Sequence, residues 1–156
     1  MKLGAVSAVL GVVGVIAYHT ALAEDDLCEP LRSFVESVGP DETRVLKFHT
    51  TWGSNFNDSQ GWVMGAKRCN DFDYDPAKGV CAHFMKHGAT EFAGMNAKRA
   101  VECLAPGVTF AGRIDLQLIS LSLTYGTEDR GAIVDITFLE DEEIGGMALT
   151  ISADGY

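Results

Sequence analysis

Four cysteines constrain the fold of this chain more than any other feature of its sequence. They are Cys28, Cys69, Cys81 and Cys103. No two of them have the C-x₂₋₄-C spacing of a zinc site, so in an exported chain they predict two disulfide bonds. The stretch from Cys69 to Leu104 contains three of the four together with two predicted helices. We expect the rest of the fold to be arranged around this stretch.

The N-terminal residues have the pattern of an export signal. Lys2 precedes an almost unbroken apolar run from Leu3 to Ala17, and Ala21-Leu22-Ala23 has the small-x-small pattern that signal peptidase recognises. The run is shorter than the roughly 18–20 residues that span a bilayer, which favours cleavage over an N-terminal anchor helix. We therefore expect residues 1–23 to be a cleaved signal peptide and residues 24–156 to form one domain. The expected location is the periplasm or the exterior, with a bacterial source favoured.

The charge of the chain limits the classes of partner. Twenty-two acidic residues against twelve basic ones give a formal net charge of −10 at pH 7. Nucleic acid and anionic membrane surfaces repel such a protein, so neither is an expected partner after the signal is removed. A basic protein partner fits the charge, although acidity also simply keeps a small domain soluble.

Apolar residues at helical spacing predict an N-terminal helix and a helix hairpin. One face of the N-terminal helix carries Leu27, Leu31, Phe34, Val35 and Val38. Asp75 and Pro76 supply a cap and a first-turn proline for a second helix, which Gly88 ends. A third helix, capped by Thr90, ends at Leu104. Its connection of about two residues to the second helix predicts an antiparallel hairpin.

The hairpin geometry favours one pairing of the cysteines. If the chain reverses between the two helices, Cys103 lies about six residues, or roughly 9 Å, from Cys81 along the axis. That exceeds the Cα separation of roughly 4.4–6.8 Å that a disulfide needs. We therefore expect Cys28–Cys81 and Cys69–Cys103. The pairing Cys69–Cys81 with Cys28–Cys103 stays open, because residues 70–75 could fold back.

Alternating apolar and polar residues predict four strands, one between the first two predicted helices in the sequence and three after the third helix. The strands are Arg44–Trp52, Ile133–Leu139 and Met147–Ile151, and Ile114–Tyr125 is a longer one whose change of phase at Leu118-Ile119 predicts a bulge or bend. The fold class is therefore α+β: a curved antiparallel sheet of three to four strands, packed on the N-terminal helix and a disulfide-pinned helix hairpin. This order resembles the cone-shaped domains of the cystatin-like and nuclear-transport-factor-2-like superfamilies, a likeness of architecture that implies no function.

A metal site has one weak candidate in the sequence, His83 with His87. Spacing i, i+4 puts both imidazoles on one side of a helix, but the Glu that a zincin needs after its first His is Phe84. A third ligand would have to come from His49, Glu91 or the run Asp71, Asp73 and Asp75. That run lacks the Gly and the Glu of a calcium loop. An ordinary helix flank is favoured, and no metal or other cofactor is expected.

Two polar segments are the candidate partner-binding surfaces. A Gly-, Ser- and Asn-rich segment, residues 53–65, carries Phe56 and Trp62 and follows Trp52. Exposed aromatic rings in such a loop would bind a protein or a sugar, whereas the alternative is that they complete the core. The second segment is an acidic turn of Glu140, Asp141, Glu142 and Glu143.

The function predicted from these features is binding rather than catalysis. The sequence has no Gly-x-Ser-x-Gly motif, and oxidised cysteines supply no thiolate. We predict an exported non-enzymatic binding protein, of the inhibitor or immunity type, that neutralises a secreted or cell-wall-acting hydrolase. The alternative is a small-molecule-binding or enzymatic domain. Its pocket would lie between sheet and helices and be lined by His49, Asp115 and Gln117.

Overall fold

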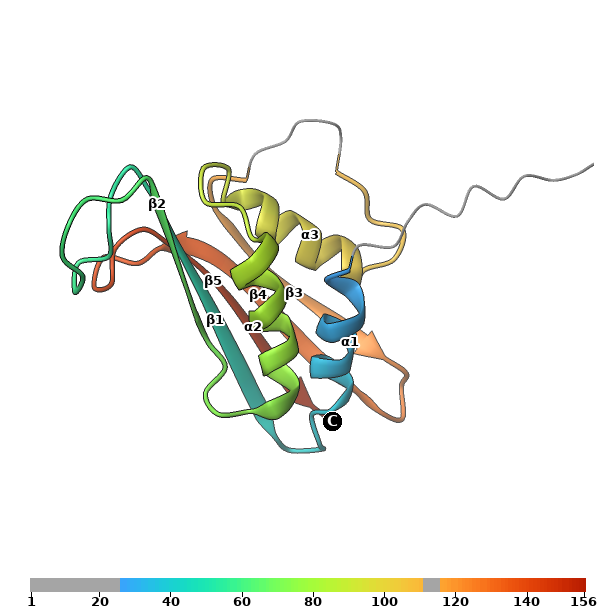
Figure 1. Cartoon of the computed structure of the whole chain (residues 1–156). Coiled ribbons are helices and arrows are strands. Elements are labelled where there is room, and N and C mark those ends of the chain that lie inside the picture. The colour runs from blue at the N-terminus through green and yellow to red at the C-terminus, as the bar shows by residue number, and fades with distance from the viewer. Residues whose placement is uncertain (1–25, 111–115) are drawn as a thin grey trace, which may run out of the picture.

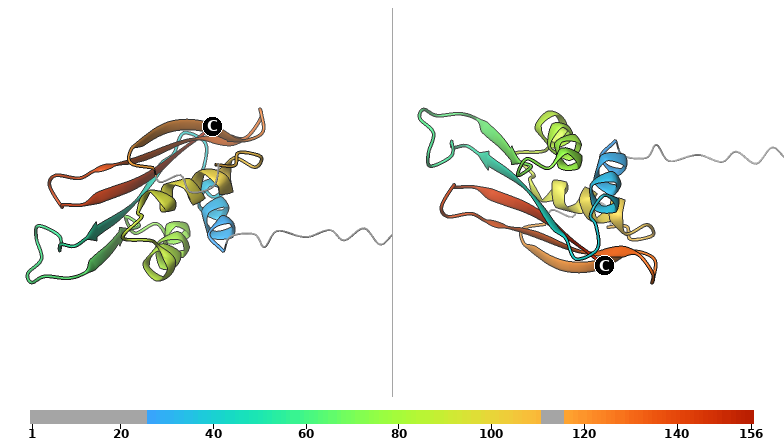
Figure 2. Two further views of the ribbon diagram at one scale, coloured as in Figure 1. Left: turned by 90° about the horizontal axis from the view of Figure 1, so that it is seen from above. Right: turned by 90° about the horizontal axis from the view of Figure 1, so that it is seen from below.

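The computed structural model describes residues 26–110 and 116–156, which form one antiparallel sheet with helices on one of its faces (Figures 1 and 2). The helices are α1 (Cys28–Glu36), α2 (Asp75–His87) and α3 (Gly94–Leu104). The strands are β1 (Thr43–Trp52), β2 (Gly65–Asn70), β3 (Ile119–Gly126), β4 (Gly131–Glu140) and β5 (Met147–Gly155), in the order β2-β1-β5-β4-β3. The α+β class is confirmed, but the sheet has five strands instead of three to four. The predicted signal peptide, residues 1–23, lies outside the described residues.

The predicted meander of the last three strands is confirmed. β3 pairs with β4 and β4 with β5, and β1 then joins the other side of β5 with Phe48 opposite Leu149. The buried apolar side chains of β1, β4 and β5 alternate along each strand and face the helices; among them are Leu46, Phe48, Val134, Ile136, Leu149 and Ile151. Phe48 stacks on Phe84 of α2 with 4.8 Å between ring centroids. The core therefore fills the space between the sheet and the helical layer.

The change of phase at Leu118-Ile119 marks the beginning of a strand. β3 begins at Ile119, and the described residues just before it, 116–118, are not paired in the sheet. The predicted bulge or bend inside one long strand is therefore wrong for these residues. Leu116 and Leu118 belong to the segment that leads from α3 to the sheet. The backbone of Leu116 lies against Gly94.

The edge strand β2 is absent from the sequence-based prediction. None of its six residues is buried, so the alternation of buried apolar and exposed polar side chains that predicts a strand is missing. It pairs with β1 so that Cys69 lies opposite Phe48, on the side of the sheet that faces the helices. This position decides the disulfide partner of Cys69.

The predicted helix hairpin is not formed. A connector of residues 88–93 separates α2 from α3, and α1 contacts each of them more extensively than they contact each other. In Figure 1, α2 and α3 do not run side by side. The prediction failed because the connector is longer than the two residues expected. Its residues Glu91–Ala93 form a turn that Thr90 does not cap as a helix.

The disulfides are Cys28–Cys103 and Cys69–Cys81, with Cα–Cα distances of 4.8 Å and 5.5 Å. The favoured pairing, Cys28–Cys81 with Cys69–Cys103, is therefore wrong, and the pairing left open is the one formed. Cys69 in β2 lies beneath α2, which carries Cys81, while the end of α3 meets the beginning of α1. Two disulfides are typical of proteins in an oxidising, extracytoplasmic environment. Within residues 26–110 and 116–156, no helix has the length and apolarity to cross a membrane.

Candidate functional site

The two predicted partner-binding segments meet at one end of the sheet. β1 and β5 are antiparallel neighbours, so the loop that follows β1 and the turn that precedes β5 leave the sheet at the same end (Figure 1). Asn57 joins them: its backbone N–H donates to the carbonyl of Ile144 at 2.8 Å. Its side-chain Nδ2 donates to the carbonyls of Glu142 and Glu143 at 3.1 and 3.2 Å. We call residues 52–64 with residues 140–146 the loop-and-turn surface.

Exposed aromatic and acidic side chains lie together on the loop-and-turn surface. Trp52 is 48% exposed and Trp62 is 71% exposed. The indole Nε1 of Trp62 donates to the carbonyl of Gly53 at 3.0 Å, which fixes the ring against the loop. The side chains of Glu140, Glu142 and Glu143, on the turn that Asn57 joins to this loop, are exposed as well. Such a combination is common where one protein binds another. The partner buries the aromatic rings, which supply contact area, and the charged groups accelerate association.

Phe56 has a different position from the one expected. It is only 4% exposed, and the guanidinium of Arg68 lies 4.6 Å from its ring centroid. Arg68 also holds Asp58 through two 2.8 Å bonds, which keep the pKa of that carboxyl at about 2. This cluster folds the loop back against β2. Phe56 therefore packs beneath the surface of the loop, and its ring is not accessible to a partner.

Asp141 is engaged within the protein. Its Oδ1 accepts the backbone N–H groups of Glu143 and Ile144 at 3.1 and 3.0 Å, and its Oδ2 lies 3.0 Å from Nε2 of His49. The N–H of Ile144, followed by the bond to His49, holds the pKa of Asp141 below its ordinary value. Asp141 shapes the acidic turn, while its three glutamate neighbours face solvent.

His49 does not line the pocket that the sequence predicts. Side chains alternate along β1, so His49 lies on the face of the sheet away from the helices, where it is 3% exposed. Its Nδ1 is buried and has no hydrogen-bond partner among the described residues. Asp115, the second predicted residue, lies outside the described part of the chain, and Gln117, the third, does line a pocket.

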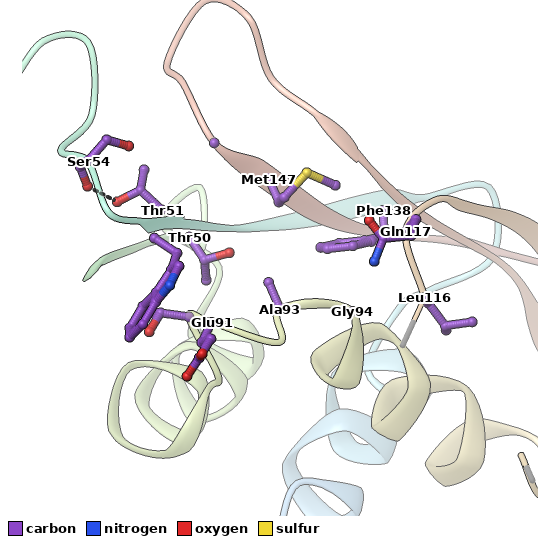
Figure 3. A pocket seen from close by; sticks show the side chains of 13 residues that line it. Thr50, Thr51, Ser54, Glu91, Ala93, Gly94, Leu116, Gln117, Phe138 and Met147 are labelled. Atoms are coloured by element: carbon purple, nitrogen blue, oxygen red, sulfur yellow. Dashed lines mark hydrogen bonds between the residues drawn. The ribbon is translucent and has the colours of Figure 1, made fainter. Parts of the chain in front are cut away.

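That pocket has a volume of about 270 Å³ and opens between the end of the sheet and the α2–α3 connector (Figure 3). Its polar lining residues are Thr50, Thr51, Trp52, Ser54, Thr90, Glu91 and Gln117. Its apolar lining includes Ala93, Leu116, Phe138 and Met147. Among the described residues that line it, only Glu91 is ionisable. The pocket and the loop-and-turn surface share Trp52, Ser54 and Gly146.

Local contacts fix the walls of this pocket. Asn96 is 2% exposed, and its amide donates to the carbonyl of Ala89 and accepts from the N–H of Ala89, both at 2.8 Å. A side chain at Gly94 would collide with the backbone carbonyl of Leu116, so the backbone of α3 lies directly on that segment. Thr90 packs in the same way on Gly65 of β2. The connector is therefore held to α3 through Ala89 and lies against β2 through the side chain of Thr90.

The two helical histidines share no third ligand within the part of the chain that the structure describes. Their ring centroids lie 4.9 Å apart, and Nε2 of His83 lies 2.9 Å from the guanidinium of Arg99. Among the described residues, no group of three or more His, Cys, Asp and Glu side chains converges as a metal site requires. The guanidinium has no acceptor, so it donates to Nε2 of His83 and engages the lone pair of that nitrogen.

No sequence motif indicates the role of three residues that organise this end of the molecule. Asn57 joins loop and turn, Asn96 anchors the connector, and Glu91 lines the pocket. The Asn-rich composition of residues 53–65 predicts a loop, but it does not indicate that Asn57 contacts the acidic turn. Comparison of the chain with protein-family models, with curated proteins and with solved structures found no match.

Proposed function

We propose that this protein is an exported, non-enzymatic binding protein that docks a basic protein partner through the loop-and-turn surface. One observation carries the proposal: Asn57 joins the segment that carries the exposed Trp52 and Trp62 to the turn that carries three exposed glutamates. The sequence indicated the loop and the acidic turn as two separate candidate surfaces for binding a partner. Their junction gives a surface with both the rings and the charges that a docking site needs.

Charge on this surface favours a basic partner. Glu140, Glu142 and Glu143 are exposed, whereas the neighbouring cation, Arg68, is paired with Asp58. The whole chain carries a formal charge of −10. A positive partner would therefore approach faster than a neutral one, and the rate would fall as salt screens the field.

The partner class follows from the compartment that we propose. The disulfides support a periplasmic or secreted location, where basic cell-wall-acting hydrolases are accessible to a small acidic protein. Neutralising such a hydrolase requires a firm docking surface and no catalytic residues. We therefore propose an inhibitor or immunity-type protein as the specific form of this function.

A capture experiment tests the proposal. Immobilised protein is exposed to a panel of purified basic cell-wall hydrolases, with cytochrome c as a basic protein of unrelated activity. We expect saturable binding of a hydrolase that weakens about tenfold between about 50 and 300 mM salt, and inhibition of its activity. Equal binding of cytochrome c, or no binding of any hydrolase, would contradict the proposal.

A matched pair of double variants locates the binding surface. Glu142→Gln/Glu143→Gln removes two charges from the acidic turn, and Glu128→Gln/Asp129→Asn removes two from the exposed β3–β4 turn at the opposite end of the sheet. We expect the first to slow association roughly fivefold and the second to leave it unchanged. Equal slowing by both would indicate attraction by net charge without a defined surface.

A second candidate function, binding of a small molecule, is supported by the 270 Å³ pocket with its hydroxyl, amide and carboxylate groups. Native mass spectrometry of protein purified from its own cells tests this candidate. A small molecule retained by the protein and lost in a Thr50→Val variant would favour it over docking of a protein.

A further inference from the structure

The pocket opens beside the surface that we propose for docking. Trp52, Ser54 and Gly146 belong to both, so a partner seated on the loop-and-turn surface would cover the pocket mouth. We infer that this pocket is a subsite for the guanidinium group of an arginine side chain presented by the basic partner. The inference rests on the proposed function and adds the chemistry of one contact to it.

The charge of the pocket selects a cation. Glu91 is the one ionisable side chain among the described lining residues, and no lysine or arginine is included with it. The remaining polar groups are hydroxyl and amide groups that can accept hydrogen bonds, notably from Thr50, Thr90 and Gln117. An anion would meet a carboxylate with no compensating cation, whereas a cation would be paired and hydrogen-bonded.

The geometry of the lining suits a planar cation on an apolar stem. Trp52 lines the pocket and is about half exposed, so an indole surface is accessible there for stacking. Figure 3 shows Thr50 and Glu91 toward one end of the pocket, with Ala93 and Met147 in its middle. The apolar middle would contact the methylene groups of the stem, while the carboxylate of Glu91 accepts two N–H groups of the guanidinium.

The size of the pocket favours a single side chain. About 270 Å³ is below the roughly 300–1,000 Å³ typical of pockets that enclose a drug-sized ligand. The connector that forms one wall is held by Asn96 and by the close contact of Gly94 with Leu116. A pocket whose walls are held in this way loses little conformational entropy when it receives a side chain.

The first test uses a free analogue and needs no partner. Nα-acetyl-L-arginine methylamide is titrated into ¹⁵N-labelled protein at constant ionic strength, with the matching citrulline compound as a neutral isostere and the lysine compound as a second cation. We expect a dissociation constant of roughly 10 mM, with shifts of the Trp52 indole N–H and of the Thr90 and Glu91 amides. The Trp62 indole, which donates to Gly53, should stay in place.

Variants decide whether Glu91 is responsible. Glu91→Gln should weaken binding of the arginine analogue at least fivefold, and Glu128→Gln, on the exposed β3–β4 turn at the opposite end of the sheet, should leave it unchanged. Both residues are exposed, so neither change should disturb the fold, and the amide spectrum verifies this. An equal response to the citrulline compound, or shifts confined to the acidic turn, would overturn the inference. A lysine compound that binds more tightly would overturn the choice of arginine.

The two proposals fail in different ways. If the analogue binds the pocket but Glu91→Gln leaves capture of the hydrolase unchanged, the pocket receives a free guanidinium compound and the partner contact is refuted. If capture depends on Glu142 and Glu143 while the analogue never binds, docking stands without this subsite. If the analogue binds and no hydrolase is captured, the proposed function fails and the cation specificity of the pocket remains.

Discussion

Nε2 of His49 lies 3.0 Å from Oδ2 of Asp141 and joins the middle of β1 to the turn between β4 and β5. The two residues are 92 positions apart in the sequence. The same carboxylate accepts two backbone N–H groups of its own turn, so a single side chain fixes the turn internally and to the sheet. The shape of the acidic half of the loop-and-turn surface depends on this contact.

Asp141→Asn tests the contribution of this carboxylate. The bonds from Ile144 and His49 lower its pKa in the folded protein, so the folded state favours the ionised form. The stabilisation is therefore complete above the unfolded pKa of about 3.9 and is lost as the pH falls through the lower folded value. We expect the variant to lose about 1–2 kcal/mol at pH 7. Below the folded pKa of Asp141 the difference should shrink. Urea unfolding at several pH values measures both effects, and an undiminished difference in acid would contradict the explanation.

Asn96→Ala should loosen the α2–α3 connector. The buried amide satisfies both backbone groups of Ala89, and its removal leaves them without these partners. We expect a loss of about 2–3 kcal/mol in the free energy of unfolding, together with faster amide exchange in residues 88–93. Met95→Ala, an exposed neighbour on α3, serves as the control and should change stability little. Similar effects of the two changes would mean that the amide bonds do not hold the connector.

Arg68→Lys should release the loop of residues 53–64 while keeping the charge. Lysine cannot reproduce the two parallel bonds to Asp58 or the planar contact with the Phe56 ring. We expect limited proteolysis in this loop to accelerate several-fold with little change in global stability. Lys67→Arg, at the adjacent position of β2, is the matched control. Unchanged cleavage in Arg68→Lys would show that the loop is held by other contacts.

The disulfide pairing predicts unequal costs of removal. Cys28–Cys103 closes a sequence separation of 75 residues and Cys69–Cys81 one of 12. In the chain-entropy view, replacing both cysteines by alanine should cost roughly 4.5 kcal/mol for the first pair and roughly 3 kcal/mol for the second. Peptide mapping of the unreduced protein checks the pairing, and denaturant unfolding of the two double variants checks the order. A Cys28–Cys81 peptide would contradict the fold described here.

Periodicity predicted the elements that are amphipathic. α1, α2, β1 and the meander of β3, β4 and β5 each bury one face, so their apolar residues recur at the period of the element. β2 escaped prediction because none of its side chains is buried, so no alternation of apolar residues marks it in the sequence. The hairpin prediction failed because the chain between α2 and α3 forms a turn held by bonds between Asn96 and Ala89, and no motif in the sequence indicates these bonds.

In the candidate site, too, some features could be predicted from the sequence and others depend on tertiary contacts. The exposed tryptophans and the acidic turn could be predicted from composition and loop chemistry, and they do lie at the surface. The burial of Phe56 and the engagement of Asp141 could not, because both depend on residues that are distant in the sequence. The pocket that contains Glu91 is formed by segments from five parts of the chain, so no single segment indicates it.

The sequence by itself determined the α+β class, the positions of the amphipathic helices and strands, the acidic balance and the presence of two disulfides. These properties follow from local periodicity and from residue chemistry, which act within a few residues. Only the tertiary structure decided which cysteines pair, that loop and turn form one surface, and that a pocket opens beside it. Each of these depends on which strand lies next to which, and that choice is made by burial and pairing over the whole chain.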